Sequence, residues 1–262
     1  MNYQGAFKDK RVVVTGAAGI YGGWIAEAFA REGATLCLSD MRRDLLDGVV
    51  ARLGLDPQVT LLHGTDLTDA DSIRSLAQHV AAAWGAPDIV VNNAGVYPRT
   101  GVLINLEDAE FDRIMAVNVR APFIVTKLMA RLMVAQGVEG AVVNIGSGAA
   151  RQMPTGSVTY CMSKTALERL SKGQALELAP HRIRVNVVEP GFAPGSDFSY
   201  LPPDYVERMT ARIPLGRNSE PGDAAGMVLY LCSPAAGYVT GAVVSVDGGN
   251  SIGTFQPTPV NS

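Results

Sequence analysis

Short runs of apolar, mostly β-branched residues alternate along this chain with longer segments that have helical patterns. Each short run is apolar almost throughout, which is typical of parallel strands covered by helices on both faces. We expect seven strands, over residues 11–15, 35–39, 60–63, 89–92, 141–145, 184–188 and 243–246. The longer segments predict six helices, over residues 22–32, 44–53, 70–84, 107–136, 158–178 and 221–232.

The alternation of strand and helix is typical of βαβ units, which build a parallel sheet. It predicts an α/β fold with a Rossmann-type, doubly wound parallel sheet of about seven strands. No Pro/Gly/Ser-rich linker, composition shift or repeat divides the 262 residues, so we expect one domain over 1–262 that ends in a tail over 250–262. Ligands of such sheets bind beyond the carboxyl ends of the strands, where the strand order reverses. Candidate functional residues are therefore those that follow each strand.

Composition and charge narrow the class of partner. Hydrophobic residues make up 47% of the chain and charged residues 18%, which allows a core and argues against a disordered chain. The formal net charge is −3 and the arginines stand singly or in pairs, so we do not expect nucleic acid as a partner. No apolar run approaches the roughly 20 residues of a membrane helix, and residues 1–10 lack a signal-peptide-like apolar stretch. We expect a cytoplasmic protein that acts on a small molecule without a membrane partner.

The cysteines and histidines do not form a metal-ligand pattern. The three cysteines have neither metal nor disulfide spacing and are expected to be buried and reduced, and the three histidines are isolated in the sequence. We therefore expect no metal site. The residues concerned are Cys37, Cys161, Cys232, His63, His79 and His181.

A glycine-rich turn follows the first expected strand. Residues 15–23 read Thr-Gly-Ala-Ala-Gly-Ile-Tyr-Gly-Gly and lead into the first expected helix. Glycines in such a turn let the backbone approach a pyrophosphate, and the helix N-terminus offers amide donors and a partial positive charge. A plain tight turn is the alternative, but the strand before and the helix after favour a dinucleotide site.

An acidic residue ends the second expected strand. Asp40 lies eighteen residues after Gly22, about where a carboxylate receives the adenosine ribose hydroxyls of NAD and repels the extra phosphate of NADP. Arg42 and Arg43 are an opposing signal, because a nearby arginine can accept that phosphate. The carboxylate at the strand end favours NAD as the cofactor.

Together with further motifs, these features resemble the short-chain dehydrogenase/reductase family over nearly the whole chain, residues 9–249. Ser147 lies thirteen residues before Tyr160, which is the family spacing. The matching segments, in the family's order, are Thr65-Asp66-Leu67, Asn92-Asn93-Ala94-Gly95, Val117-Asn118-Val119, Ser147, the YxxxK motif Tyr160 to Lys164, Pro190-Gly191 and Val246-Asp247-Gly248-Gly249.

The resemblance implies a catalytic set, a cofactor site and a homotetramer. It gives Tyr160 the role of general acid/base, Lys164 a bond to the nicotinamide ribose and Asn118 a proton-relay water. The implied catalytic residues are Asn118, Ser147, Tyr160 and Lys164. The implied cofactor-binding residues are Gly16, Gly19, Ile20, Tyr21, Gly22, Asp40, Asp66, Leu67, Asn93, Ala94, Gly95, Tyr160, Lys164, Pro190 and Gly191.

Two positions depart from the family pattern. Single-domain members carry TGxxxGxG, which would place glycine at position 20, whereas this chain has Ile20 and the TGxxGxxG spacing of the epimerase-like branch. Gly19 is expected to supply the backbone freedom that position 20 lacks. The second departure is Gly195, where the family often has a threonine that bonds the nicotinamide carboxamide; Ser196 is the nearest substitute.

The candidate catalytic residues have a definite chemistry. Tyr160 and Lys164 are four residues apart on an expected helix and share one face. Lowering a tyrosine pKa of about 10 by two to three units needs roughly 3–4 kcal/mol. An ammonium about 5 Å away supplies roughly 3 kcal/mol at an effective dielectric near 20. We therefore expect Lys164 to make Tyr160 acidic enough to exchange the hydroxyl proton, while Ser147 holds the substrate oxygen.

Residues 192–214 form a long segment rich in proline, glycine and aromatic residues, where the family has its substrate lid. We expect a largely apolar pocket for a bulky apolar or aromatic substrate. Asp197 and Asp204 leave open a cationic group, as in an amino alcohol, although solvated lid charges are the plainer interpretation. The residues expected to line the pocket are Tyr97, Ser147, Met153, Phe192, Phe198, Tyr200 and Leu201.

Three functions stay open on the sequence. The favoured one is an NAD-dependent enzyme that interconverts a secondary alcohol and a ketone. The second is an epimerase- or dehydratase-like enzyme that uses NAD transiently, suggested by the glycine spacing but weakened by the short chain. The third is a catalytically silent NAD-binding module, which the intact Ser147, Tyr160 and Lys164 argue against.

Overall fold

The computed structural model of the chain describes residues 3, 5–97, 102–195 and 201–255. Within these residues seven strands form one sheet in the order β3-β2-β1-β4-β5-β6-β7, and all neighbouring strands are parallel. The predicted doubly wound parallel sheet is confirmed. The strands are β1 (Arg11–Thr15), β2 (Thr35–Asp40), β3 (Leu61–Gly64), β4 (Ile89–Asn92), β5 (Ala141–Ile145), β6 (Arg184–Pro190) and β7 (Val243–Val246).

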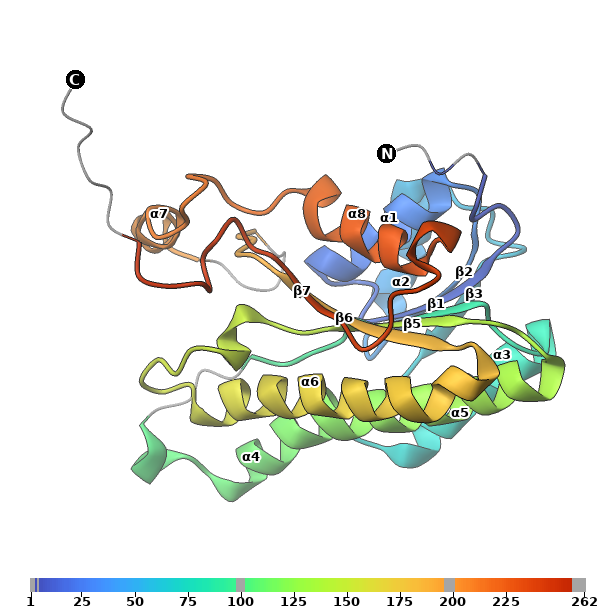
Figure 1. Ribbon diagram of the computed structural model, residues 1–262, viewed down its shortest axis with the longest axis horizontal. Helices are drawn as coiled ribbons and strands as arrows, with labels where there is room; N and C mark the ends of the chain where they lie inside the picture. Colours follow the sequence, from blue (N-terminus) through green and yellow to red (C-terminus); the bar gives the residue numbers. More distant parts are fainter. Residues whose placement is uncertain (1–2, 4, 98–101, 196–200, 256–262) are drawn as a thin grey trace.

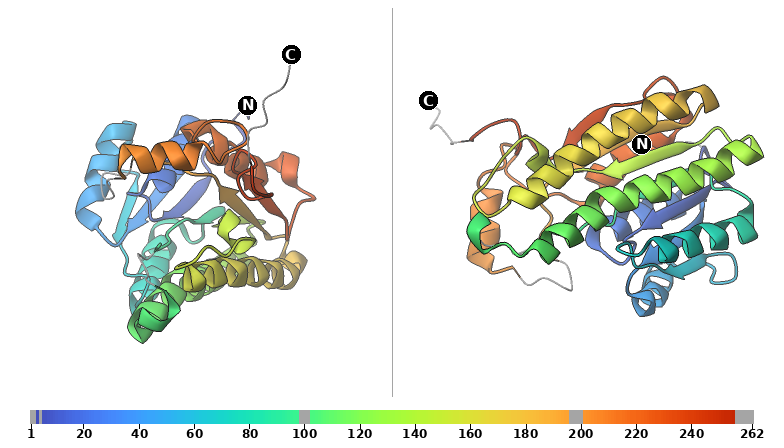
Figure 2. Two further views of the ribbon diagram at one scale, coloured as in Figure 1. Left: turned by 90° about the vertical axis from the view of Figure 1, so that its left-hand side faces the viewer. Right: turned by 90° about the horizontal axis from the view of Figure 1, so that it is seen from below.

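Helices cover both faces of the sheet (Figure 1). One layer contains α1 (Ile20–Arg31), α2 (Arg43–Leu53) and α8 (Pro221–Cys232). The other contains α3 (Ala70–Trp84), α5 (Ala121–Gln136) and α6 (Val158–Leu178), which run side by side when the molecule is seen from below (Figure 2).

Residues of one strand alternate between these two layers. On β1, for example, Val12 and Val14 pack with the first layer and Val13 with the second, and all three are fully buried. Because both faces of the strand are covered, the apolar run is continuous rather than alternating.

The strand order reverses between β1 and β4, which pair side by side at the centre of the sheet. The turns that follow these two strands therefore lie next to each other at the carboxyl edge. This is the position at which doubly wound sheets bind ligands. The strands β2 and β6 extend to Asp40 and Pro190, so both candidate residues end a strand.

The single helix predicted over 107–136 is wrong. The structure has α4 (Asp108–Met115), a π turn (Ala116–Arg120) and then α5. Pro122 lies in the first turn of α5 and has no N–H to bond an earlier carbonyl, which favours a local departure from α-helical bonding. The predicted lid also contains a helix that the sequence pattern did not indicate, α7 (Pro203–Thr210).

Candidate active site

The glycine-rich turn after β1 is shaped by close backbone contacts. Gly16 has a φ of +65°, and a Cβ there would lie 2.7 Å from the Cα of Ala94. A Cβ on Gly22 would overlap the Gly16 carbonyl oxygen. Gly19 is the N-cap of α1, so the helix begins at Ile20. The expectation that Gly19 supplies special backbone freedom is wrong, because its φ of −78° and ψ of 171° are extended values that any residue adopts.

Thr15 and Asn93 hold the turn after β1 against the turn after β4. The Asn93 side-chain amide donates to the carbonyls of Thr15 and Gly16, at 3.0 Å each. The Thr15 hydroxyl oxygen accepts from the backbone N–H groups of Asn93 and Ala94, at 3.1 and 3.2 Å. The segment Asn92 to Gly95 therefore forms the second wall of the cleft that begins at Gly16.

Asp40 faces the same turn from the end of β2. Its Oδ2 accepts from the backbone N–H of Ala18 at 3.1 Å, and its Oδ1 accepts from the backbone N–H of Arg42. The Arg42 Nε lies 3.9 Å from the carboxylate, so this arginine leans toward Asp40. The carboxylate thus lies beside the glycine turn, as the strand-end position predicts.

Asp66 and Leu67 follow β3, at the same edge of the sheet. Hydrogen bonds from the Thr68 hydroxyl and backbone N–H lower the pKa of the exposed Asp66 carboxyl, so it is held as a carboxylate. The Leu67 side chain packs against the apolar layer under α3 and α5.

Tyr21 joins the glycine turn to the segment after β6. Its hydroxyl donates to the Gly191 carbonyl at 2.8 Å, and burial raises the pKa of this phenol to about 12, so it stays a donor. A Cβ on Gly191 would lie 3.0 Å from the Asp247 Cα, which explains why glycine is required after Pro190. The sequence did not indicate this cross-link, because Tyr21 and Gly191 are 170 residues apart.

The predicted catalytic residues meet between β5 and α6. The Ser147 hydroxyl hydrogen-bonds the Tyr160 phenol from the loop after β5. The Lys164 Nζ donates to the Ile145 carbonyl at 2.9 Å and lies 5.8 Å from the centre of the Tyr160 ring. A Cβ on Gly95 would lie 3.4 Å from that Nζ, so the second wall of the cleft ends directly at the lysine.

The expectation that Lys164 makes Tyr160 acidic is wrong for the protein without its cofactor. Burial raises the pKa of Tyr160, and this outweighs the lowering by the Ser147 hydrogen bond. Lys164 is itself only 4% exposed, and burial lowers its pKa to about 8. Removing both groups from water therefore penalises the phenolate and the ammonium alike, a cost that the sequence-based estimate did not include.

Asn118 is buried in the π turn and acts as a brace. Its side-chain oxygen accepts from the Val96 backbone N–H at 2.8 Å, and its amide donates to the Val96 carbonyl and the Ser163 hydroxyl. Its own backbone carbonyl lacks the usual α-helical donor four residues later, because that residue is Pro122. The side chain therefore fixes the wall of the cleft, and the carbonyl is the group suited to a water.

The substrate side is only partly described. Tyr97 packs edge-to-face on Tyr160, with ring centres 4.6 Å apart, and Met153 is exposed near the same edge. Phe192 contacts Tyr205 of α7 instead. Leu201 is half-buried just before α7. The candidates Phe198 and Tyr200, and also Ser196 and Asp197, lie outside the described residues.

Asp204 does not support a cation site. Its carboxylate pairs with Arg208 of the same helix at 2.6 Å, and the hydrogen bond from Arg208 lowers the pKa of this fully exposed group. It is a solvated charge on α7, which was the plainer interpretation of the sequence.

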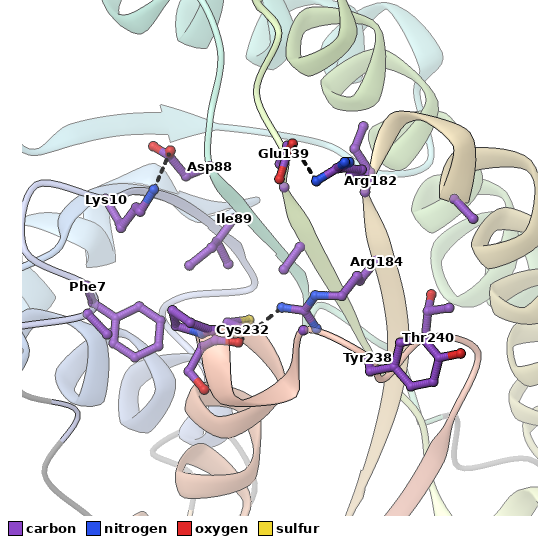
Figure 3. A pocket seen from close by; sticks show the side chains of 18 residues that line it. Phe7, Lys10, Asp88, Ile89, Glu139, Arg182, Arg184, Cys232, Tyr238 and Thr240 are labelled. Carbon is purple, nitrogen blue, oxygen red and sulfur yellow. Dashed lines mark hydrogen bonds and ion pairs between the residues drawn. The ribbon is translucent and has the colours of Figure 1, made fainter.

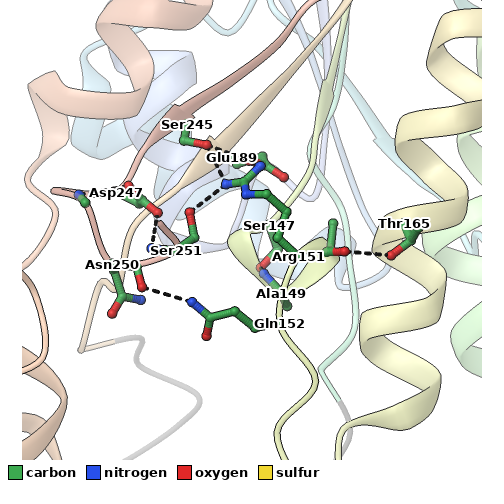
Figure 4. A network of polar contacts seen from close by, with 12 residues as sticks. Ser147, Ala149, Arg151, Gln152, Thr165, Glu189, Ser245, Asp247, Asn250 and Ser251 are labelled. Carbon is green, nitrogen blue, oxygen red and sulfur yellow. Dashed lines mark hydrogen bonds and ion pairs between the residues drawn. The ribbon is translucent and has the colours of Figure 1, made fainter. Parts of the chain in front are cut away.

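A polar network that the sequence did not indicate lies beside these residues and joins the buried Glu189 to the partly exposed Arg151 (Figure 4). Arg151, from the loop after Ser147, pairs with Glu189 at 2.5 Å and donates to Ser245 and Ser251. The only signal in the sequence was an acidic residue at the end of the apolar run Val-Asn-Val-Val-Glu.

Two cavities lie away from the Tyr160 phenol. One of about 950 Å³ opens at the amino edge of the sheet, beside Asp88, Glu139 and Arg184 (Figure 3). Another of about 500 Å³ lies beside Gly191 and Phe192, under the segment that follows α7. Within the described ranges, no three potential metal ligands cluster together, and no helix has both the length and the apolar character needed to cross a bilayer.

Comparison with known proteins assigns the chain to a protein family. A family model described as enoyl-(acyl carrier protein) reductase matches residues 16–251. The chain belongs to the short-chain dehydrogenase/reductase family. It is an oxidoreductase of CH–OH groups, and this family uses NAD(P) as its cofactor.

Relatives share the chain's full length. The chain is 34% identical to a 3-oxoacyl-[acyl-carrier-protein] reductase of Thermotoga maritima, covering 92% of this chain and 98% of the relative. It is 36% identical to a galactitol 2-dehydrogenase (L-tagatose-forming) of Cereibacter sphaeroides, covering 96% and 100%. A crystal structure of a short-chain type dehydrogenase/reductase from Mycobacterium marinum superposes with a TM-score of 0.86 at 33% identity, covering 94% and 96%.

The residues at the carboxyl edge fit a dinucleotide. Gly16 and Gly22 let the turn pack against Ala94 and against its own backbone, where a Cβ would collide, and the free amide groups at the N-terminus of α1 lie at this turn. Asp40 lies at one end of this cleft, and Lys164 and Tyr160 lie at the other. A cofactor that spans the cleft would place its reactive ring near the phenol.

Proposed function

We propose that this enzyme interconverts a secondary alcohol and a ketone with NAD, using Tyr160 as the general acid/base. The observation that carries the proposal is the meeting of Ser147, Tyr160 and Lys164 at the end of the cleft that starts at Gly16. A phenol beside a hydroxyl donor is a suitable arrangement for the proton transfer that accompanies hydride transfer at a carbinol carbon.

Each residue has one task in this chemistry. Bound NAD supplies the hydride acceptor or donor. The Tyr160 oxygen takes the hydroxyl proton during oxidation and returns it during reduction, and the Ser147 hydroxyl donates to the substrate oxygen. Lys164 contributes the positive charge near the phenol, and Asn118 holds the cleft wall and offers its backbone carbonyl to a proton-relay water.

Ketone reduction and alcohol oxidation should depend on pH in opposite ways, because they need different protonation states of Tyr160. Reduction needs the protonated phenol, which burial favours, so its rate should be highest at neutral pH and fall as the phenol loses its proton. Oxidation needs the phenolate, so its rate should rise with pH and then decline where Lys164 loses its proton and with it the positive charge near the phenol. Initial rates in both directions across the pH range would test this assignment.

Asp40 supports NAD rather than NADP. Its carboxylate lies beside the glycine turn at the end of β2, where it would repel an added phosphate. Arg42 leans toward this carboxylate, at 3.9 Å, which offsets part of the arginine's charge.

The substrate is proposed to be bulky and apolar or aromatic. The ring of Tyr97 packs against Tyr160 and offers an aromatic wall next to the reacting oxygen, and Met153 and Phe192 add apolar surface at the same edge of the sheet. A homotetramer, a cytoplasmic location, one domain over 1–262, a lid over 192–214 and a tail over 250–262 remain predictions from the sequence.

A panel of secondary alcohols and ketones, assayed with NAD(H) and with NADP(H), tests the proposal. We expect a net change in NADH absorbance with aromatic or bulky apolar compounds, at higher kcat/KM than with small polyols. Product formed without a net change of NADH would instead indicate an epimerase- or dehydratase-like enzyme. Cofactor binding without turnover of any compound would indicate a silent module.

A further inference from the structure

Two carboxyl groups lie near Lys164 on the side of the sheet that α6 covers. Glu189 is the last residue but one of β6, and its side chain is 0% exposed. Strand alternation places it on the same face as Val185, which packs under α5 and α6. Glu168 lies one turn after Lys164 on α6 and so faces the same region. A buried carboxylate is costly unless something neutralises it.

One oxygen of Glu189 is neutralised by donors. Its Oε2 pairs with the Arg151 guanidinium at 2.5 Å and accepts from the Ser245 hydroxyl at 2.7 Å (Figure 4). The other oxygen, Oε1, has no donor among the described residues, and neither has the buried Oε1 of Glu168. Each carboxyl group therefore has one buried oxygen that still needs a hydrogen-bond donor.

A hydrogen bond between the Glu168 and Glu189 carboxyl groups is one of the causes that raise the pKa of Glu168. Two carboxylates have only acceptors, so such a contact requires a proton on one of them. Burial, the hydrogen bond with Glu189 and the charge of Glu189 all raise the pKa of Glu168, against smaller effects of Arg151 and Lys172. The geometry and this direction agree that the pair holds a proton.

The charge of the Glu168–Glu189 pair affects the pKa of the neighbouring Lys164. Burial lowers the pKa of its ammonium to about 8, and the negative charge of Glu189 raises it. The other charged groups around the pair are Arg151, which is bound to Glu189, and Lys172, on the next turn of α6. On the side of β7, the Asp247 carboxylate is held by the backbone N–H groups of Gly249 and Ser251.

We propose that Glu168 and Glu189 share one proton at neutral pH, and that the remaining negative charge of this pair keeps Lys164 in its ammonium form. Both are positioning residues, because they act on the reaction only through Lys164. The effect on catalysis rests on the proposed function, whereas the shared proton is a property of the protein alone.

The two carboxamide variants should act in opposite directions. Glu189→Gln moves the negative charge of the pair from Glu189, the carboxylate that acts on Lys164, to Glu168, so the lysine should lose its proton at lower pH. Glu168→Gln imitates a permanently protonated Glu168 and leaves Glu189 fully ionised, so the lysine should keep its proton to higher pH. A purely structural role would weaken the enzyme in both variants without moving its pH dependence in opposite directions.

Infrared spectroscopy of the unliganded protein tests the shared proton. In H₂O and D₂O at pH 7, the wild type should show the C=O stretch of a protonated carboxylic acid, and both Glu168→Gln and Glu189→Gln should abolish it. Glu177→Gln is the matched control, an exposed glutamate further along α6, and should keep the band. A wild type without the band, or a band that survives in either variant, overturns the proposal.

The pH profile of kcat/KM for alcohol oxidation tests the link to Lys164. The alkaline decline should move to lower pH by about one unit in Glu189→Gln and to higher pH in Glu168→Gln. Movement in the same direction, or none, overturns the link. If Glu189→Gln does not fold because Arg151 loses its partner, the wild type and Glu168→Gln still decide both points. If the wild type oxidises no alcohol, the proposed function fails, while the infrared band still decides the shared proton.

Discussion

The two edges of the sheet use polar side chains in different ways. At the amino edge, Asp88 accepts from the Arg11 guanidinium at 2.8 Å and from its backbone N–H at 3.0 Å. Asp88 also pairs with Lys10 (Figure 3). Arg184 donates to the carbonyls of Leu231 and Val239. These charges are matched to fixed partners, and their effect is to stabilise chain ends and strand starts.

At the carboxyl edge, Lys164 and Tyr160 have fewer hydrogen-bond partners than they could have, and neither has an ion-pair partner among the described residues. Lys164 has one backbone acceptor and a lowered pKa, and Tyr160 has a raised pKa with Ser147 as its hydrogen-bond partner. A group with unused hydrogen-bonding capacity in a cleft can exchange a proton with a substrate, whereas a fully paired group cannot. The comparison therefore predicts that substitutions at the carboxyl edge alter activity, whereas substitutions at the amino edge alter stability.

The largest effect is expected at the reacting oxygen. Tyr160→Phe should lower kcat by about 10²–10⁴-fold, because it removes only the atom that carries the proton. NADH affinity, measured by fluorescence titration, should stay close to that of the wild type. The control is Tyr238→Phe, a fully exposed phenol at the amino edge, which should not change kcat. Turnover near the wild-type level in Tyr160→Phe would exclude the proposed mechanism.

The next effect is expected in the glycine turn. Gly22→Ala places a Cβ against the Gly16 carbonyl, and overpacking costs about 1–3 kcal/mol. We expect the affinity for NADH to fall about 10–100-fold, since each 1.4 kcal/mol is about tenfold. Gly48→Ala on α2, where a Cβ meets nothing within 4 Å, is the control and should bind as the wild type does. Equal affinities in the two variants would show that this turn does not hold the cofactor.

A smaller effect is expected at the end of β2. Asp40→Ala removes the carboxylate that should repel the extra phosphate of NADP, and the ratio of kcat/KM for NAD over NADP should fall about tenfold. Asp44→Ala, which removes an exposed charge four residues later, should leave the ratio unchanged. A wild type that already prefers NADP would contradict the cofactor proposal.

The smallest effect on activity, and a measurable one on stability, is expected at the amino edge. Asp88→Asn should lower the free energy of unfolding by about 1–3 kcal/mol, as for other hydrogen bonds to a charged group, with kcat unchanged. Burial raises the pKa of Asp88, but the hydrogen bonds from Arg11 and Lys10 outweigh it and lower the pKa overall. Its contribution to stability is therefore present above an unfolded-state pKa of about 4 and is lost as the pH falls through the lower folded-state value.

Denaturant titrations at neutral and acidic pH check whether the contribution of Asp88 to the free energy of unfolding is lost as the pH falls. The stability difference between wild type and Asp88→Asn should shrink on acidification. Glu139→Gln is the matched control at the same edge: its pair with Arg182 is exposed on both sides, so it should change stability by less than about 0.5 kcal/mol. A loss of kcat in Asp88→Asn would break the division between the two edges.

The features that the sequence predicted well are those set by neighbours along the chain. The strands β1, β4, β5 and β7 and the helices α3, α6 and α8 begin and end where the pattern placed them, because continuous apolar runs and helix-length segments are local signals. The turn at Gly16, the strand-end position of Asp40 and the shared face of Tyr160 and Lys164 have the same origin.

Other features came only from packing between distant segments. The bond from Tyr21 to Gly191 and the grouping of Arg151, Glu168 and Glu189 join segments that no local pattern relates. The π turn at Asn118 and the helix α7 were missed because each departs from its surroundings over a single short stretch.

The sequence alone determined which groups could do the chemistry: a phenol, a hydroxyl, an ammonium and a glycine turn, in one order along the chain. Only the tertiary structure decided their charge, because the pKa of a side chain depends on how much water is removed from around it. Lys164 and Tyr160 are neighbours on one helix in either description, but burial at the strand ends raises the pKa of the phenol and lowers that of the ammonium.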